Sequence, residues 1–379
     1  MKKLNRDDYI EQLATGKMSR RQFSKVLASA GIATVMLPMG FSGPARADAS
    51  DHPNVFTWEG WDANQHHLEY FEKHGEYPNF SIFGDEEEAF AKIMAGAQFD
   101  VSHPCSYKVE IWRDAGIIQA IDTGRLSYWD NIIPSLKNIP GMTHEGETYF
   151  IPADWGLTSV MYRPDLVDEK YQEEETWGIL WDERYAGRLS MSDSLIDGVM
   201  VAAIYGGAEN PFDMTDSEVE MTRELLRKQL PLLRYYWTSP TDLENSIAAG
   251  ELVATSSWND AYTSLKNQGV NVKYMNPKEG AMTWVCGFCL MTAADPEKLE
   301  KSYDAINAFL SPDSGVFSFF DSGYGHSNID AYSLVTEGFL AERGLSSDPE
   351  AMLSSGIFQI PIANEAVLQA MFEEVKAGL

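Results

Sequence analysis

The chain has 379 residues, of which 57 are Asp or Glu and only 29 are Lys or Arg, so its formal net charge is −28. A phosphate-binding face needs clustered basic residues, and this charge therefore argues against nucleic acid as a partner. Three cysteines are too few for a disulfide framework, and a chain of this length exceeds one ordinary hydrophobic core, so we expect two lobes.

The N-terminus has the pattern of a secretory signal. Adjacent Arg20 and Arg21 lie in a charged segment and indicate twin-arginine export. An apolar stretch over residues 26–41 follows, and small residues end at Ala47 or Ala49, either of which fits a cleavage site. The apolar stretch contains a proline and is shorter than the ~20 residues that span a bilayer. We therefore expect a protein that is exported to the periplasm, with its signal peptide removed.

Short apolar segments alternate with amphipathic ones along the rest of the chain. This alternation predicts α/β lobes with largely parallel sheets and helices outside. The expected strands are 54–58, 99–103, 189–191 and 252–256, and the helices that follow them are 64–74, 107–115, 194–205 and 261–267.

The segments that follow the expected strands are rich in aromatic or acidic residues. In sheets of this kind, ligands gather at the carboxyl ends of the strands, in the loops that lead into helices. These segments are 58–61, 103–107, 193–197 and 258–260. Their convergence predicts a binding site.

Large aromatic residues are concentrated at these positions. A single tryptophan usually packs in a core, but several rings at loop mouths favour a cage for an organic cation, because each ring presents a negative face. The aromatic residues at or just beyond expected strand ends are Trp58, Trp61, Trp258, Trp284, Tyr107 and Tyr324.

Two pairs of acids accompany the aromatic residues. Asp193 and Asp197 straddle an expected strand end and helix start, where a carboxylate either stabilises the helix N-terminus or contacts a ligand. Glu59 and Asp62 flank the first tryptophan pair and carry the same two interpretations. Both interpretations stay open.

Features of enzymes are weak in this sequence. Cys286 and Cys289 have C-x-x-C spacing, but they lie in a strand-like run where their side chains face opposite ways. Adjacent His66 and His67 diverge on a helix and cannot chelate one metal. We expect no catalytic residue, no metal and no cofactor.

Six segments, in order, resemble the spermidine/putrescine-binding proteins of polyamine ABC importers, and the likeness runs from about residue 54 to the C-terminus. The resemblance implies a periplasmic-binding-protein (Venus flytrap) fold of type II topology, a monomer, and an ABC permease and ATPase as partners. The matching segments are 58–61 (WEGW), 99–107 (FDVSHPCSY), 151–158 (IPADWGLT), 181–193 (WDERYAGRLSMSD), 250–258 and 277–284 (PKEGAMTW).

Placement and resemblance together nominate the site residues. The candidate ligand contacts are Trp58, Trp61, Ser106, Tyr107, Asp193, Asp197, Trp258, Trp284 and Tyr324. Further candidates are Glu59, Cys105, Trp155, Ser194, Cys286 and His326. The expected signal peptide is 1–49, the first lobe 50–153 with 284–327, and the second lobe 154–283 with 328–379.

The chain departs from the family pattern after Trp284. Polyamine binders usually have W-x-D there, whereas this chain has Cys286. A long polycation needs one carboxylate for each charged end, because a buried ammonium without a partner is costly. The lost anchor favours a methylated onium zwitterion such as dimethylsulfoniopropionate or a betaine, whose carboxylate takes a donor near Ser194, Ser106 or His326. A polyamine held by the remaining acids is the alternative, and an exported enzyme on this scaffold is a third.

The cysteines allow two states. Cys105 and Cys286 fall in different family segments that meet at the expected site, so a disulfide between them is compatible with an oxidising compartment. Two free buried thiols are the state we expect.

Overall fold

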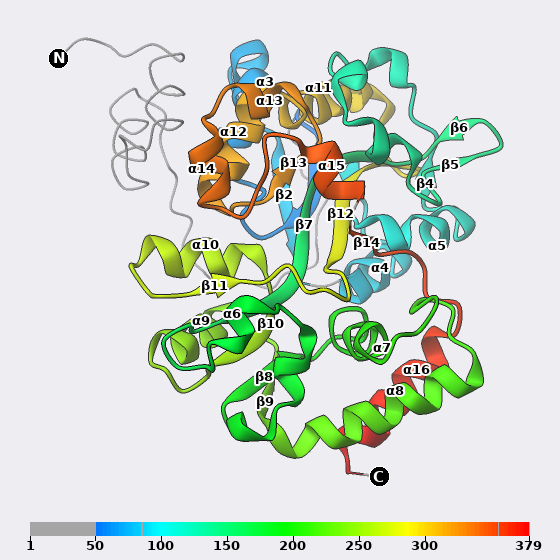
Figure 1. Cartoon of the computed structure of the whole chain (residues 1–379). Coiled ribbons are helices and arrows are strands. Elements are labelled where there is room, and N and C mark those ends of the chain that lie inside the picture. The colour runs from blue at the N-terminus through cyan, green and yellow to red at the C-terminus, as the bar shows by residue number, and fades with distance from the viewer. Residues whose placement is uncertain (1–50, 85, 355, 379) are drawn as a thin grey trace. The chain divides into compact units, whose positions relative to one another are not determined.

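A computed structural model describes residues 51–84, 86–354 and 356–378 (Figure 1). The expected signal peptide lies outside these residues. Contacts divide the described chain into two units, each built from three segments. Unit 1 comprises 51–154, 286–321 and 325–350, and unit 2 comprises 155–285, 322–324 and 351–378.

The observed division differs from the expected lobes in the last third of the chain. The first two boundaries lie within two residues of the expected ones. However, residues 325–350 pack in unit 1, and only the short segment 322–324 returns to unit 2 before residue 351. The buried side chains of Ala331, Tyr332 and Leu340 bind this segment to unit 1, because their apolar surface is removed from water there.

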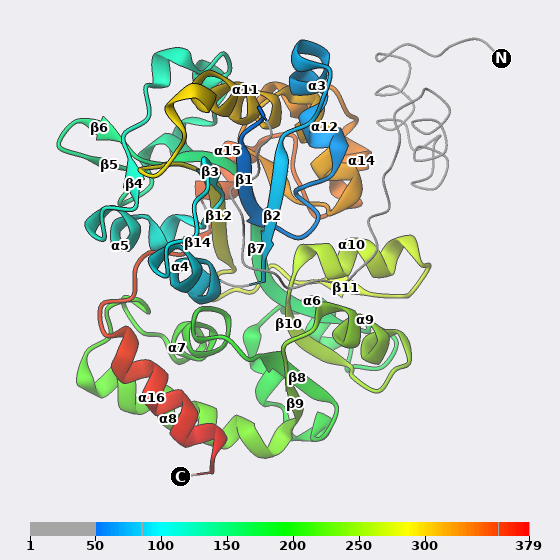
Figure 2. The same cartoon turned by 180° about the vertical axis from the view of Figure 1, so that it is seen from behind.

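Unit 1 is built on a sheet whose first three strands are parallel. β1 (Asn54–Trp58) lies between β2 (Asn79–Phe83) and β3 (Val101–Ser102), and β12 (Met282–Met291) runs antiparallel to β3 (Figure 2). The helices of this unit are η1 (Asn64–His67), α3 (Leu68–His74), α4 (Glu86–Met94), η2 (Ser106–Lys108), α5 (Val109–Asp114), α11 (Leu299–Phe309), α12 (Pro312–Asp321), α13 (Asp330–Ser333) and α14 (Glu337–Ala341).

Unit 2 has a second sheet, also with a parallel centre. β8 (Leu189–Ser192) lies between β9 (Leu233–Trp237) and β10 (Ala254–Trp258), and β10 runs antiparallel to β7 (Ile151–Tyr162). The helices of this unit are α6 (Lys170–Glu173), η8 (Leu195–Val199), α7 (Met200–Gly206), α8 (Asp216–Gln229), α9 (Pro240–Ala248), α10 (Asn259–Asn267) and α16 (Glu365–Lys376). The parallel pairing agrees with the α/β alternation of the sequence.

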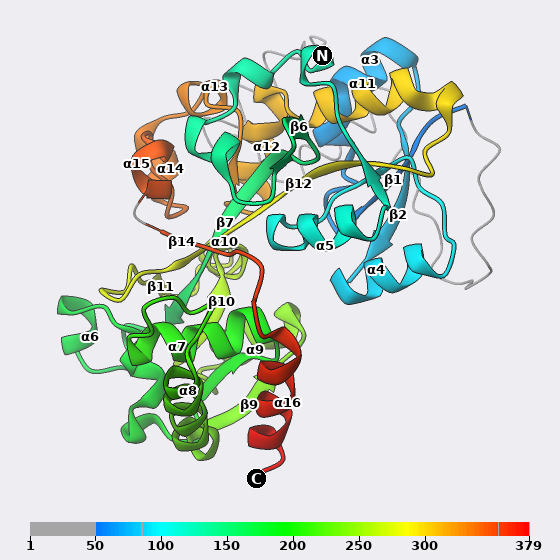
Figure 3. The same ribbon diagram turned by 90° about the vertical axis from the view of Figure 1, so that its right-hand side faces the viewer.

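The C-terminal helix α16 completes the core of unit 2 and packs against α8 (Figure 3). Its buried residues Leu368, Met371, Phe372 and Val375 lie three or four apart and therefore form one apolar face. The Phe372 ring meets Tyr236 of β9 edge to face, with centroids 5.3 Å apart. Among the described residues, no helix is long and apolar enough to cross a membrane.

Candidate functional site

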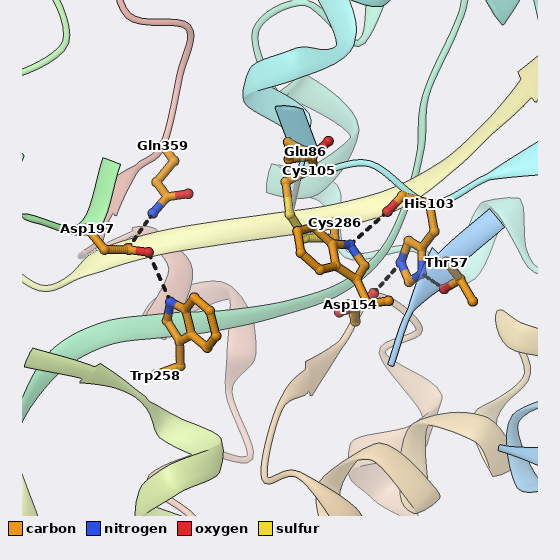
Figure 4. The surroundings of a disulfide bond; sticks show 10 residues. Thr57, Glu86, His103, Cys105, Asp154, Asp197, Trp258, Cys286 and Gln359 are labelled. Atoms are coloured by element: carbon orange, nitrogen blue, oxygen red, sulfur yellow. Dashed lines mark hydrogen bonds and ion pairs between the residues drawn. A yellow bond between two sulfur atoms is a disulfide. The ribbon is translucent and has the colours of Figure 1, made fainter. Parts of the chain in front are cut away.

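In unit 2, the turn that follows β8 positions a buried carboxylate. Ser194 caps this turn, because its hydroxyl accepts the Asp197 N–H at 3.4 Å. The carboxylate of Asp197 is therefore not the cap. It accepts a hydrogen bond from the Thr158 hydroxyl at 2.7 Å. It also accepts hydrogen bonds from the Gln359 amide at 3.1 Å and the Trp258 indole N–H at 3.1 Å (Figure 4).

The Asp197 side chain is almost completely removed from water. Only 4% of the residue is exposed, and burial raises the pKa of the carboxyl group, while the hydrogen bonds from Thr158, Trp258 and Gln359 oppose that rise. The network fixes the edge of the Trp258 indole, and the ring stays partly exposed at the end of β10. Asp197 thus orients an aromatic side chain that the sequence nominated for a cation.

Asp193 has a different environment. Its carboxylate forms an ion pair with the ammonium of Lys376 of α16 at 2.6 Å, and its side chain is partly exposed. The two acids that the sequence treated as one pair therefore have separate partners.

Trp284 and Tyr324 form an aromatic pair in unit 2. Their rings meet edge to face, with centroids 4.6 Å apart. Trp284 lies inside β12 rather than beyond a strand end, and it is buried, so its expected position at a loop mouth was wrong. Its indole N–H finds no acceptor among the described residues.

Asn259 holds the backbone around this aromatic pair. Its side-chain oxygen accepts the Leu157 N–H at 3.0 Å, and its amide donates to the Gly323 carbonyl at 2.6 Å. Gly156 is required beside it, because a Cβ there would approach the Trp284 ring to 2.2 Å. The segments that contain Leu157, Asn259 and Gly323, which are far apart in the sequence, are thereby fixed around Trp284.

In unit 1, the predicted residues surround a buried histidine. The Trp58 indole donates to the His103 carbonyl at 2.9 Å. The His103 ring bonds to the Thr57 hydroxyl at 2.9 Å and to the Asp154 carboxylate at 2.8 Å (Figure 4). Trp58 and Trp61 are partly exposed, whereas Glu59 is exposed. The hydrogen bonds among Thr57, His103 and Asp154 thus fix the end of β1, which carries Trp58.

Cys105 and Cys286 form a disulfide, so the expected pair of free thiols was wrong. The two residues lie opposite each other in an antiparallel bridge, a proximity that 181 residues of separation conceal in the sequence. Glu86 supports this position by accepting the Cys105 N–H at 2.6 Å. Cys289 is free and buried.

The remaining candidates have varied surroundings. The buried Ser106 hydroxyl has no partner among the described residues, and Tyr107 beside it is partly exposed with the Lys108 ammonium 5.3 Å from its ring centroid. Trp155 is fully buried. His326 bonds through its ring to Phe309 and to the backbone N–H of Asn328, and burial lowers its pKa to about 4. That neutral ring has no N–H left for a ligand.

The structure brings together two subsets of the nominated residues in unit 2, Asp197 with Trp258 and Trp284 with Tyr324. It also adds two residues that the sequence did not nominate, Thr158 and Gln359, which both donate to Asp197. Gln359 lies just after β14 (Ile357–Phe358), and no motif marks it, because its role depends on a contact across 162 residues. In the described part of the chain, no group of His, Cys, Asp or Glu is arranged to hold a metal.

Comparison with known proteins gives consistent results. Residues 81–333 match the model of the bacterial extracellular solute-binding protein family. A spermidine/putrescine-binding periplasmic protein of Escherichia coli K12 is 26% identical over 363 residues, which cover 94% of this chain and 99% of the relative. A putrescine/agmatine-binding protein of Pseudomonas aeruginosa is 24% identical, with 86% and 92% covered.

Solved structures confirm the expected fold. The spermidine/putrescine ABC transporter substrate-binding protein of Streptococcus pneumoniae matches with a TM-score of 0.73 at 18% identity, over 86% of this chain and 99% of that one. A binding protein of A. tumefaciens in complex with glucopine matches with a TM-score of 0.67 at 14% identity, over 86% and 99%. The fold is therefore that of periplasmic binding proteins, and the relatives are binding proteins rather than enzymes.

Proposed function

Because the chain belongs to the bacterial extracellular solute-binding proteins, we propose that it captures a small organic cation of the polyamine kind and delivers it to an ABC importer. The observation that carries this proposal is the buried Asp197 carboxylate, which fixes the partly exposed Trp258 indole in unit 2. Its partners are then a membrane permease and an ATPase, its location is extracytoplasmic, and its working form is a monomer.

The chemistry of unit 2 suits a cation. An aromatic face over an ammonium contributes about 0.5–2 kcal/mol, and more when water is excluded. The Asp197 carboxylate accepts the Trp258 indole N–H and lies in a region of low dielectric. A negative charge in such a region attracts a cation more strongly than it does in water. Trp284 and Tyr324 add two further rings in the same unit.

The relatives favour a polyamine over the onium zwitterion that the sequence analysis preferred. The curated relatives are named for spermidine, putrescine or agmatine, each of which carries more than one cationic group. The carboxylate missing at Cys286 does not leave the chain without acids, because Asp197 and Asp260 both lie in unit 2.

One observation keeps the onium zwitterion as a second candidate. The Trp284 indole N–H is buried and has no acceptor among the described residues. An indole N–H only donates, and a polyamine ammonium only donates as well, so neither satisfies the other. The carboxylate of dimethylsulfoniopropionate or a betaine would supply an acceptor.

Isothermal titration of the mature protein with spermidine, putrescine, glycine betaine and dimethylsulfoniopropionate tests both candidates. Micromolar or tighter binding of a polyamine, with both zwitterions silent, supports the proposal. Binding of a zwitterion alone selects the second candidate, and silence of all four refutes a cation-binding role.

A variant series links that result to the site. Trp258→Ala should abolish the binding of the active cation, and Trp258→Phe should retain part of it, because the ring remains while the N–H to Asp197 is lost. Trp181→Ala is the matched control, since Trp181 is also partly exposed in unit 2 but stacks on Tyr205 and donates to Leu225. Unchanged affinity in Trp258→Ala would contradict the aromatic site.

A further inference from the structure

The disulfide between Cys105 and Cys286 lies at one of the points where the chain passes from one unit to the other. β12 begins in unit 2, and Cys286 is its first residue in unit 1. Cys105 is the N-cap residue of η2, the short helix that contains Ser106 and Tyr107. The disulfide therefore joins a segment with two predicted ligand contacts to a strand that connects the two units (Figure 4).

The same segment is also bound to the other long strand that connects the units. β7 leaves unit 1 after Asp154, and the carboxylate of Asp154 bonds to the His103 ring at 2.8 Å. Next to the disulfide, the Pro104 carbonyl accepts the Gly287 N–H of β12 at 3.0 Å. Residues 103–105 are thus held to each strand at the residue where that strand passes between the units, once by a hydrogen bond and once by a covalent bond.

Ser106 gives this segment a polar group that the chain itself does not use. Its hydroxyl is buried and has no hydrogen-bond partner among the described residues. A hydroxyl oxygen can accept an N–H from an ammonium group, so it is compatible with an organic cation. Tyr107 is partly exposed and presents an aromatic ring. Because η2 is only three residues long, the positions of both side chains depend on how Cys105 is held.

A small dithiol can reach this disulfide more readily than it can reach the third cysteine. Cys105 and Cys286 are 8% and 5% exposed, whereas Cys289 is completely buried. In thiol–disulfide exchange, a thiolate of the dithiol attacks one sulfur of the disulfide, and the other cysteine leaves as a thiolate that takes up a proton. The second thiol of the dithiol then breaks the mixed disulfide. The dithiol is oxidised to its own disulfide, and the two cysteines gain two electrons and two protons in total.

We propose that the disulfide between Cys105 and Cys286 is a redox-sensitive positioning element for ligand binding. The intact bond holds Ser106 and Tyr107 beside β12 in the geometry in which they meet the cation, and a dithiol in the extracytoplasmic compartment releases them. The proposal rests on the proposed function, because it requires that an organic cation binds. Released side chains must be ordered again on binding, so reduction weakens the affinity. The hydrogen bond from the segment to β7 remains, so the reduced protein stays folded.

Calorimetric titration of putrescine and spermidine into the oxidised protein and into the dithiothreitol-reduced protein tests this proposal. The Kd of the polyamine that binds should rise about tenfold or more on reduction, because Ser106 and Tyr107 are no longer held in place. The double variant Cys105→Ser/Cys286→Ser should bind as weakly as the reduced protein and should not respond to dithiothreitol. Cys289→Ala is the matched control, since it removes a thiol but keeps the disulfide, and it should respond like the wild type.

Three further readouts separate positioning from a general loss of stability. Leu340→Ala truncates a completely buried side chain of α14 in the same unit, so it should destabilise unit 1 without changing the Kd of the folded protein. Reoxidation of reduced Cys289→Ala should restore the original Kd, because only one disulfide can then form. On reduction, hydrogen exchange should become faster over residues 103–108 and stay unchanged in β8 of unit 2.

Each outcome has a distinct meaning. If the oxidised protein binds neither putrescine nor spermidine, the proposed function fails, and the redox-sensitive element fails with it. If the oxidised protein binds but reduction leaves the Kd unchanged, the redox-sensitive element alone is overturned. The same holds if dithiothreitol does not reduce the bond in the folded protein. An equal loss of affinity in Leu340→Ala also overturns it, because the effect would then follow stability alone.

Discussion

In unit 1 burial lowers the pKa of the histidines His66, His67 and His326, whereas in unit 2 burial raises the pKa of the acids Asp197 and Asp260. Burial opposes the charged form in both cases, but it lowers the pKa of a histidine and raises that of an acid. The three histidines of unit 1 are therefore uncharged at neutral pH, although the same unit also buries the carboxyl groups of Glu86, Asp100 and Asp154. The difference teaches that acidification acts in opposite senses on the groups of the two units whose pKa burial shifts.

The largest expected effect is the loss of stability when the pH is lowered. Burial lowers the pKa of His67 and His326 to about 4 in the folded protein, whereas an unfolded histidine has a pKa of about 6.5. Between these pH values the unfolded chain binds more protons than the folded protein, so the free energy of unfolding decreases as the pH falls from about 6.5 towards 4. At pH 5 the cost is about 2 kcal/mol for each histidine. The raised pKa values of Asp197 and Asp260 act in the opposite sense, since they favour the folded state as the pH falls.

Hydrogen exchange measured at pH 7 and pH 5 tests this contrast. Amide protection should decline in unit 1 and be retained in unit 2. His144→Ala should leave the pH dependence unchanged, because His144 is exposed. Equal loss of amide protection in both units would contradict the expected difference between them.

The second effect concerns the disulfide of unit 1. Breaking the bond between Cys105 and Cys286 releases a loop closed across 181 residues, and its loss should lower the free energy of unfolding by about 2–4 kcal/mol. Denaturant unfolding with and without a reductant measures this difference. Cys289→Ala should show the same reductant effect as the wild type, since Cys289 is not bonded. If the free energy of unfolding is the same with and without the reductant, the disulfide does not stabilise the fold.

The third effect probes the buried acid network of unit 2. Asp197→Asn places an amide against three donors and should lower the free energy of unfolding by about 2–3 kcal/mol, because at least one donor loses its acceptor. Chemical denaturation at pH 7 gives the value. Thr158→Val removes one donor and should cost less. If both variants keep wild-type stability, the network does not hold Trp258.

The smallest effect should come from Asp193. Its ion pair with Lys376 is partly exposed, so Asp193→Asn should change stability by less than about 1 kcal/mol. Cation affinity should also change little, because the carboxylate is already paired with Lys376. Titration calorimetry of the wild type and Asp193→Asn measures both affinities. A large loss of affinity in Asp193→Asn would return this residue to the group of ligand anchors.

The sequence predicted much of the fold because its signals are local. The strand that ends at Trp58 and the helical segment over 64–74 agree with the structure, since hydrophobic pattern and turn residues act over a few positions. The expected helix over 194–205 was recovered only in part, because its first turn is the wider turn η8 that carries Asp197.

The site was harder to predict because its contacts are distant in sequence. Trp258 lies at a strand end, where the sequence placed it, but Gln359, which donates to the same Asp197 carboxylate, lies 162 residues after Asp197 and carries no motif. The bond between Cys105 and Cys286 depends on strand pairing that spacing does not reveal. Asp260 lies in the segment 258–260 that the sequence placed at the predicted site, but its link to Tyr324 exists only in three dimensions.

The interrupted order of the two units has a consequence for synthesis. Unit 2 draws its last core residues from α16, and unit 1 takes strand residues from beyond position 286. A growing chain therefore cannot finish one unit and then begin the other, as it does when domains follow each other end to end. The core of unit 1 is incomplete until about residue 350, and the core of unit 2 is incomplete until α16 has been added, so a stop codon before α16 would leave the apolar face of unit 2 uncovered and expose the truncated product to proteolysis.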